Sequence, residues 1–213
     1  MEDQADQIVY SKEVIDFVSV ANNYCQLAEG AVELNRRQLL TEALGILSNL
    51  YYRATNLPDI EPLLEEQAEH LVTEEDWDYI HQTIQRILGR HDAYQEVFDP
   101  NIQYSETPVG ASLAENFADI YQDIKNFITL YQIGTTEIMH DALWECRQNF
   151  EQYWGQKLVN ALRPMHQLLF NTPDLDDEEE KIPDNKTTLE DVDTSDWIIT
   201  RQQQQYKEDE NEE

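Results

Sequence analysis

The stretch from Thr136 to Phe170 constrains the fold of this chain more than any other. Its apolar residues recur at steps of three or four, which keeps them on one face of a helix with 3.6 residues per turn. They are Met139, Leu143, Cys146, Phe150, Trp154, Leu158, Ala161, Met165 and Leu168. A single helix of this length would run ~50 Å at ~1.5 Å per residue, longer than a small domain is wide. Gly155 therefore either kinks one long helix or divides the stretch into two, and both readings stay open.

Local signals elsewhere predict an all-α fold, a bundle of five or six helices within residues 1–170. Capping sequences mark helix starts, and glycine or proline after an apolar stripe marks helix ends. The predicted starts are Ser11, Asn35–Gln38, Thr73–Asp76 and Ser112–Glu115, and the predicted ends are Gly30, Leu57–Pro58, Gly89 and Gly134. The predicted core includes Phe17, Leu47, Trp77, Phe117, Ile124, Phe150 and Trp154.

Three segments lack a helical period. Residues 1–9 are acidic and polar, and we expect them to fray. Residues 58–72 are rich in proline and acids, which favours a loop with at most one helical turn, held by Leu63 and Leu64. Residues 90–111 are too apolar for a free loop, so we expect an ordered crossover laid across the bundle.

Acidic residues dominate the composition. The chain has 44 Asp and Glu against 14 Lys and Arg, a net charge of −30. Such a charge repels phosphate and anionic lipid, so we expect no nucleic-acid partner and no membrane partner. It favours a protein partner that is basic.

Residues 171–213 are predicted to form an acidic, disordered tail, because they cannot bury enough apolar surface to offset the entropy lost on ordering. One apolar cluster interrupts the tail, and its side chains are a candidate anchor: Trp197, Ile198 and Ile199. Docking of this anchor onto the chain's own domain and onto another protein are both open. We favour a protein partner.

The sequence also predicts a compartment. It contains no apolar run of 18 residues and no N-terminal signal peptide, which indicates a soluble intracellular protein. Cys25 and Cys146 lie on apolar helix faces rather than in a Cys-x-x-Cys pair, so we expect buried, reduced thiols. A cytoplasmic location fits both observations.

Glu115, Asp119 and Asp123 are the best candidates for metal chemistry. They lie four residues apart, a spacing at which carboxylates on one helix can share a divalent cation. On a helical wheel with Phe117 at zero, the apolar arc centres near ~340°, while Glu115 and Asp119 fall at ~160° and ~200°. We therefore expect a solvated acidic face, little cost from Asp119→Ala, and no bound metal or other cofactor.

A second set of polar residues could form an internal network or a cleft. Asn116 and Asp123 stand on the shoulder of the apolar arc. Arg163 and His166 are one turn apart, and with Tyr121 or Asp123 they could line a cleft. A buried ion pair that pins two helices is the alternative, and we favour it. No nucleotide-binding or nucleophile-elbow motif occurs, so we lean against catalysis.

Four phrases resemble a bacterial family known only as domain of unknown function number 5063. They are Phe17–Cys25, Leu50–Pro58, Ser112–Lys125 and Tyr153–Arg163, and they span roughly residues 10–170. The family carries a His after Trp-Gly-x where this chain has Lys157, so no role of that His transfers here. The resemblance implies an all-helical fold and a bacterial cytoplasmic origin, and it implies no activity.

Three classes of function remain. We favour a non-catalytic protein-interaction or scaffold module, because the apolar anchor at Trp197–Ile199 has no role in a tail that only keeps the protein soluble. The second class is a metal-binding or enzymatic domain that uses helix-borne carboxylates. The third is an acidic mimic of nucleic acid, which would need two rows of acids with duplex-like spacing.

Overall fold

Helices make up most of the described chain, as the hydrophobic periods predict. The computed structural model describes residues 2–64, 70–96, 110–173 and 175–176. Its α-helices are α1 (Glu2–Val9), α2 (Lys12–Glu29), α3 (Arg36–Ala54), α4 (Glu74–Leu88), α5 (Leu113–Ile133), α6 (Thr136–Asn149) and α7 (Gly155–Asn171). The shorter elements are η1 (Ala31–Glu33), η2 (Gly89–His91), the π-helical turn η4 (Phe150–Trp154), β1 (Ala93–Gln95) and β2 (Gly110–Ser112).

Two helix starts are closed by reciprocal capping boxes, as predicted. The side chain of Asn35 accepts a hydrogen bond from the backbone N–H of Gln38 at 2.9 Å, and the Gln38 side chain accepts from the Asn35 N–H at 3.0 Å. Thr73 and Asp76 form the same arrangement at the start of α4. These boxes satisfy backbone donors that a helix leaves without partners. The local sequence therefore sets both boundaries.

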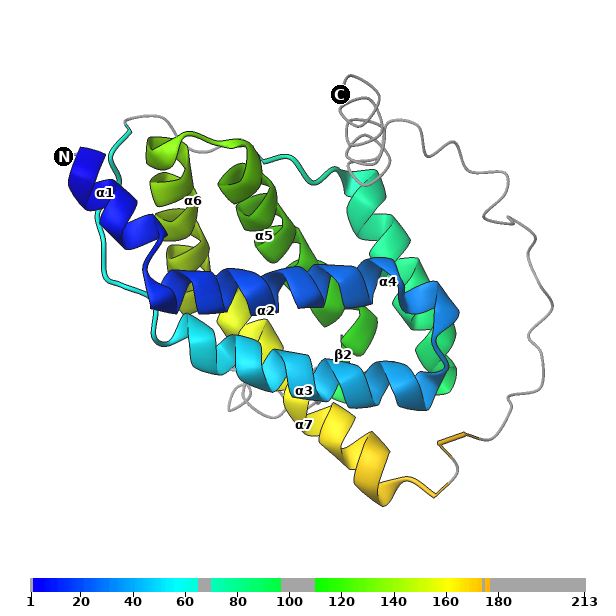
Figure 1. Cartoon of the computed structure of the whole chain (residues 1–213). Helices are drawn as coiled ribbons and strands as arrows, with labels where there is room; N and C mark the ends of the chain where they lie inside the picture. The colour runs from blue at the N-terminus through cyan, green and yellow to red at the C-terminus, as the bar shows by residue number, and fades with distance from the viewer. Residues whose placement is uncertain (1, 65–69, 97–109, 174, 177–213) are drawn as a thin grey trace, which may run out of the picture.

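Residues 136–171 form one continuous helical rod, so Gly155 does not divide this stretch into two separate helices. α6 passes through the π turn η4 directly into α7, and the rod changes direction there (Figure 1). The backbone N–H of Gly155 donates to the carbonyl of Phe150, the five-residue spacing of a π turn. A Cβ at position 155 would lie 2.7 Å from Cδ2 of Phe150, so only glycine fits here.

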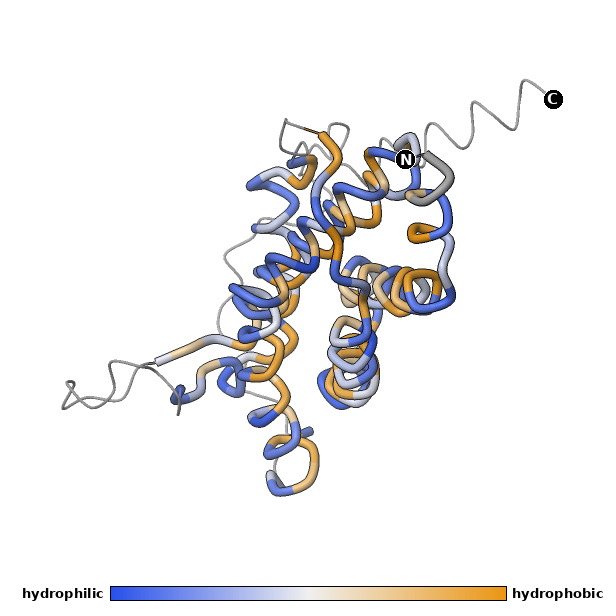
Figure 2. Tube along the Cα trace, turned by 90° about the vertical axis from the view of Figure 1, so that its left-hand side faces the viewer, coloured by the Kyte–Doolittle hydropathy of each residue, from blue (hydrophilic) through white to orange (hydrophobic). Residues whose placement is uncertain are grey.

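α5 is the central helix of the bundle. It packs against α2, α4, α6 and α7, while α2 and α3 run side by side (Figure 1). Five of the seven predicted core residues are fully buried: Phe17, Leu47, Phe117, Ile124 and Trp154. The other two, Trp77 and Phe150, are only partly buried and pack at the edge of the core. Hydrophilic and hydrophobic residues alternate along the helices that surround this core (Figure 2).

None of the helices in the described ranges has the length and apolar character needed to cross a membrane.

The prediction that residues 1–9 fray is wrong for the described residues 2–9, because they form α1 and pack against α6. Ala5 and Val9 are buried, and the Tyr131 hydroxyl donates to the Val9 carbonyl at 2.7 Å. The Thr136 hydroxyl also donates to the Asp6 carboxylate at 2.7 Å. These partners lie more than 120 residues away, which is why the local composition did not reveal them.

The connection between α3 and α4 is ordered by side chains of α5 and α6. The Asp141 carboxylate accepts hydrogen bonds from the backbone N–H groups of Leu63 and Leu64, each at 2.7 Å. The side chains of Leu63 and Leu64 are exposed, so the expectation that they hold this segment is wrong. The Asn126 side chain accepts from the N–H groups of Leu71 and Val72. No helical turn forms in the described part of residues 58–72, and residues 65–69 lie outside it.

The predicted crossover begins and ends in a short antiparallel ladder. Ala93 pairs with Ser112 and Gln95 pairs with Gly110. The buried Asp92 carboxylate accepts from the Ser112 hydroxyl at 2.8 Å and from the Ala114 N–H at 2.7 Å, which closes the start of α5. Residues 97–109, between the two strands, lie outside the described residues.

Two residues that we assigned to the tail belong to the packed body. Leu175 is fully buried, and its carbonyl accepts from the Arg36 guanidinium at 2.8 Å. Asp176 pairs with Arg37 at 2.6 Å. The candidate anchor Trp197–Ile199 lies outside the described residues, so its placement stays a prediction.

Candidate functional site

The interior of the protein contains a buried carboxylate with three donors. Asp119, on α5, is only 7% exposed. It accepts hydrogen bonds from Trp77 Nε1 at 3.0 Å, Tyr153 Oη at 2.8 Å and Lys157 Nζ at 2.8 Å. These donors come from α4, the π turn and α7, so Asp119 ties three elements to the central helix. The prediction that Asp119 faces solvent is therefore wrong, because α4 and α7 cover the side of α5 that the helical wheel left open.

Tyr153 and Lys157, the two titratable donors to Asp119, both have raised pKa values. Partial burial and the hydrogen bond to Asp119 raise the pKa of Tyr153 to about 12. Partial burial alone would lower the pKa of Lys157, but the hydrogen bond and the negative charge of Asp119 outweigh it and raise that pKa. Both groups therefore donate to Asp119 at neutral pH. This arrangement favours a structural ion pair over a proton-transfer site.

Glu115 behaves as the sequence predicts and faces solvent. Its side chain is exposed, and it approaches Lys157 Nζ only at 3.7 Å. An exposed pair of this kind contributes little to stability. Glu115 and Asp119 thus share the same lysine but differ in burial.

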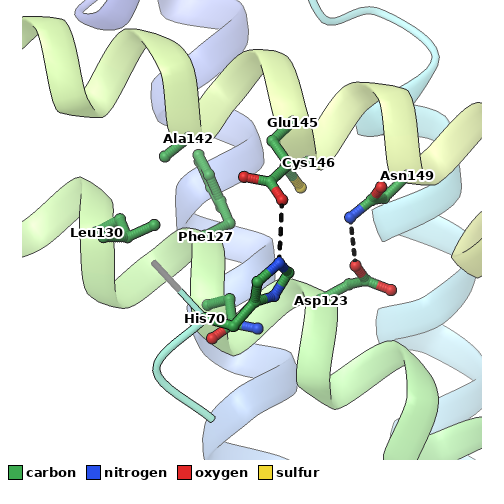
Figure 3. A pocket seen from close by; sticks show the side chains of 9 residues that line it. His70, Asp123, Phe127, Leu130, Ala142, Glu145, Cys146 and Asn149 are labelled. Carbon is green, nitrogen blue, oxygen red and sulfur yellow. Dashed lines mark hydrogen bonds and ion pairs between the residues drawn. The ribbon is translucent and has the colours of Figure 1, made fainter. Parts of the chain in front are cut away.

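Asp123 lies one turn beyond Asp119 and borders a small, partly open pocket of about 20 Å³ (Figure 3). Asn149 Nδ2 donates to Asp123 Oδ1 at 2.7 Å, and His70 Nε2 lies 3.5 Å from Glu145 Oε1. A cavity of this size has room for about one ordered water. The remaining lining residues are Asn126, Phe127, Leu130, Ala142 and Cys146.

The environment of Asp123 makes it easier to protonate than an exposed carboxyl. Burial raises its pKa to about 6, the Asn149 hydrogen bond opposes this shift, and the charge of Asp119 adds to it. Asp123 is thus a carboxyl that titrates near neutral pH beside a water-sized cavity. This property separates it from Asp119.

The three acids of α5 do not converge on one point that could hold a metal. No group of three or more His, Cys, Asp or Glu side chains in the part of the chain that the structure describes is arranged to bind an ion. Lys157 supplies the positive charge beside Asp119. The carboxylate row is therefore divided among different partners.

Asn116 and Tyr121 join polar contacts on other sides of α5. Asn116 Nδ2 donates to the Tyr94 hydroxyl of β1 at 2.6 Å. Tyr121 Oη donates to Glu29 Oε1 at 3.0 Å, and the buried Lys125 Nζ lies 2.8 Å from the same oxygen. Asn116, Tyr121 and Asp123 thus all make internal polar contacts, but with three different partner sets.

Arg163 and His166 are exposed on α7, far from the partners we expected. They line a groove of about 470 Å³ between β1 and α7, whose other lining residues are Tyr94, Gln95, Glu96, Val159, Asn160, Pro164 and Gln167. The predicted cleft with Tyr121 or Asp123 is therefore wrong, and so is the buried ion pair that we favoured. α7 presents these side chains outward because its other face packs on α3 and α5.

The outer face of α7 combines exposed apolar groups with positive charge. Val159 is 44% exposed and Phe170 is 66% exposed, and the Phe170 ring lies 4.8 Å from the His166 ring. The helix contains Lys157 and Arg163 but no Asp or Glu. Lys157 pairs with Asp119, so the outer face itself carries Arg163 and His166, and Glu96 lines the opposite side of the groove.

Sequence reasoning missed the three donors to Asp119, namely Trp77, Tyr153 and Lys157. The burial of Asp119, their common partner, could be predicted only if α5 was recognised as a helix covered on several sides. One signal was present: Ala118 and Leu130 fall at ~100° and ~220° on the same wheel, well outside the single arc. Apolar residues at those angles indicate a helix covered on several sides.

The described fold is an all-helical bundle with an internally paired polar core, and similarity to known proteins places it in a family. The chain belongs to the DUF5063 family, a domain of unknown function, whose model matches residues 8–171. It is also similar to protein BF1032 from Bacteroides fragilis, a structural-genomics target with a crystal structure. The two are 35% identical with a TM-score of 0.69, and the match covers 83% of this chain and 100% of the other. No curated protein matches the chain.

Proposed function

We propose that this protein is a non-catalytic interaction module that binds a partner segment in the groove between β1 and α7. The observation that carries the proposal is the groove of about 470 Å³ beside the exposed Val159 and Phe170. Grooves of this size lie within the ~300–1,000 Å³ range of ligand pockets in proteins. Exposed apolar side chains next to such a groove are typical of an interaction surface.

The charge of α7 specifies the chemistry of the partner segment. The groove has apolar side chains, with Arg163 and His166 on α7 and Glu96 after β1, so it suits an apolar segment that places an acid beside Arg163. This differs from the basic partner expected from the net charge of −30, which remains a prediction for the rest of the surface. The two expectations concern different faces of the molecule.

The arrangement of the α5 carboxylates weighs against the other two functions. A catalytic or metal site needs groups that are available to a substrate or ion, whereas Asp119 already accepts three hydrogen bonds. A mimic of nucleic acid needs acids displayed in rows, whereas Asp119 is buried and Asp123 is half-buried beside a small pocket. Only Glu115 of this row is exposed.

We also propose that the protein works in a bacterial cytoplasm. Cys25 and Cys146 are both buried and unpaired, and a reducing compartment keeps such thiols intact. The solved relative comes from a bacterium.

Affinity capture of matched variants tests the function. Val159→Glu places a charge at the groove, and Ile15→Glu makes the same change on α2 at an equally exposed position, 44% against 45%. We expect a partner that copurifies with the wild type and with Ile15→Glu in similar amounts, and about tenfold less with Val159→Glu, a loss of ~1.4 kcal/mol. Equal capture by both variants would refute the groove as the binding surface.

A further inference from the structure

The chain contains a segment whose chemistry complements the groove. Trp197, Ile198 and Ile199 are consecutive apolar residues, and no base lies between Lys186 and Arg201. Four acids precede or flank the apolar cluster: Glu190, Asp191, Asp193 and Asp196. The apolar side chains of the groove suit the apolar cluster, and Arg163 is a partner for one flanking acid, whereas Glu96 on the opposite side of the groove is not.

We propose that the segment Asp196–Ile199 occupies the groove between β1 and α7 of its own chain when no partner is bound. The inference rests on the proposed function, since the segment would then compete with the partner for one surface. The sequence left docking onto the chain's own domain and onto another protein open, with a protein partner favoured, and this proposal chooses the chain's own domain for the free protein.

The distribution of charge directs the segment to α7. Residues 1–170 contain 28 acids and 10 bases, and most of this surface repels an acidic segment. Of the two bases of α7, Lys157 pairs with Asp119, and Arg163 lines the groove together with Glu96. Arg36 and Arg37, the basic pair on α3, already contact Leu175 and Asp176. The groove is therefore an apolar surface at which one base offsets one acid, unlike most of the acidic body.

The chain is long enough to reach the groove. Asp176 is the last described residue, and it is held at α3 by Arg37. Twenty residues lie between it and Trp197, and the 21 steps from Cα to Cα span at most ~70–75 Å. The groove lies beside Val159–Gln167, and Val159 is only ~18 Å along α7 from the helix end at Asn171. Tethering of this kind also raises the effective concentration of the segment at the groove.

Hydrogen exchange on the purified, full-length protein tests the proposal. We expect the amides of residues 197–199 to exchange about tenfold or more slowly in the wild type and in Ile15→Glu than in Val159→Glu. A protection factor of ten corresponds to ~1.4 kcal/mol of docking free energy. Exchange that is equally fast in all three proteins would overturn the proposal, as would protection that Val159→Glu leaves unchanged.

A photo-crosslinking amino acid at position 159 identifies the occupant. We expect adducts with the peptide that contains Trp197 of the same chain. Adducts with residues 97–109, or adducts between chains in a mixture of isotopically light and heavy protein, would overturn the proposal in favour of the crossover or a second copy. This assay uses purified protein and is therefore independent of partner capture from cells. Tail docking can be observed when no partner is captured, and a partner can be captured when the tail does not dock.

Discussion

Polar residues of α5 are buried and apolar residues of α7 are exposed, so the two helices depart in opposite directions from the usual pattern of apolar residues inside and charged residues outside. On α5, Asp119 and Lys125 are buried, and each has a charged or hydrogen-bonding partner. On α7, Val159 and Phe170 are exposed, and the described residues leave a groove beside them. A buried charge requires a partner to be tolerated, whereas an exposed apolar face gains free energy when something covers it.

This difference indicates which region of the molecule is the candidate for binding a partner. The residues that a sequence reading selects first, the acids of α5, are mostly occupied in holding helices together. The groove on α7 involves residue types that attract less attention, such as Val159, Asn160 and Gln167. The acidic helix is thus the structural region, and the less acidic helix is the candidate for binding.

The largest effect on stability should come from removing the Asp119 carboxylate. Asp119→Ala leaves Trp77, Tyr153 and Lys157 without their acceptor, and we expect a loss of ~2–4 kcal/mol in the free energy of unfolding, because Lys157 remains partly hydrated. Glu115→Ala, one turn earlier and facing the same lysine, should change stability by less than ~0.5 kcal/mol. Urea denaturation measures both. Equal losses would mean that the three hydrogen bonds to Asp119 stabilise the fold no more than the exposed Glu115 does.

The π turn should be the next most sensitive feature. Gly155→Ala forces a Cβ against the ring and carbonyl of Phe150, and we expect a loss of ~1–3 kcal/mol. The matched control is Gly45→Ala in α3, where no atom lies within 4 Å of the added Cβ. That change should stabilise the protein by ~0.5–1 kcal/mol, because glycine inside a helix is unfavourable. Thermal unfolding of both variants would show opposite shifts, and shifts of the same sign would contradict the π-turn geometry.

Asp123 should make a smaller contribution that depends on pH. Its pKa of about 6 in the folded protein exceeds the ordinary value of 3.8, so the folded state binds the proton more tightly than the unfolded state. Stability therefore falls as pH rises between these two values, and the full cost is present above pH 6. We expect Asp123→Asn to be more stable than the wild type by ~1–2 kcal/mol at pH 7.5, less than the ~1.4 kcal/mol per pKa unit would give, because the group is partly hydrated.

The comparison at low pH is the control for this prediction. At about pH 3 and below, Asp123 is mostly protonated in both states, so the two proteins should become nearly equal in stability. Denaturant unfolding at about pH 3, 5, 6 and 7.5 gives the difference directly. A difference that does not change with pH would show that Asp123 is not a titrating group in this range.

Substitutions on the outer face of α7 should have the smallest effect on stability. Val159→Glu replaces an exposed side chain, and we expect a loss of at most ~1.4 kcal/mol in the free energy of unfolding, which is the part that docking of Asp196–Ile199 would contribute. Circular dichroism and urea denaturation verify this against Ile15→Glu. A large loss of stability would show that Val159 belongs to the packed body and not to a binding surface.

The sequence predicted those features of the fold that depend on neighbouring residues. The capping box predicted at Asn35–Gln38 forms, because both partners lie within one turn. Of the box predicted at Ser112–Glu115, the bond from the Glu115 N–H to the Ser112 hydroxyl is present at 3.1 Å, and Thr73 begins α4 as predicted. The glycines at positions 30, 89 and 134 end their helices for the same local reason. Of the candidate site residues, Asn116, Tyr121 and Asp123 do make internal polar contacts.

The remaining features depend on contacts between distant parts of the chain. α1 is stabilised by α6, and Asp119 is buried by α4 and α7, so neither could be deduced from its own segment. The helical wheel failed for α5 because it assumes one buried face, whereas a central helix is covered on several sides. Arg163 and His166 were assigned to the interior because their spacing was compatible with a buried pair, and spacing alone does not say which face of α7 packs.

The central claim is that the groove between β1 and α7 is the binding surface of this protein. The most direct measurement is photo-crosslinking in the cell that produces the protein, with the reactive amino acid at position 159 or at the equally exposed position 15. We predict a discrete adduct with another protein from position 159 and none from position 15. Identical adduct patterns from both positions, or no adduct with another protein from position 159, would contradict the claim.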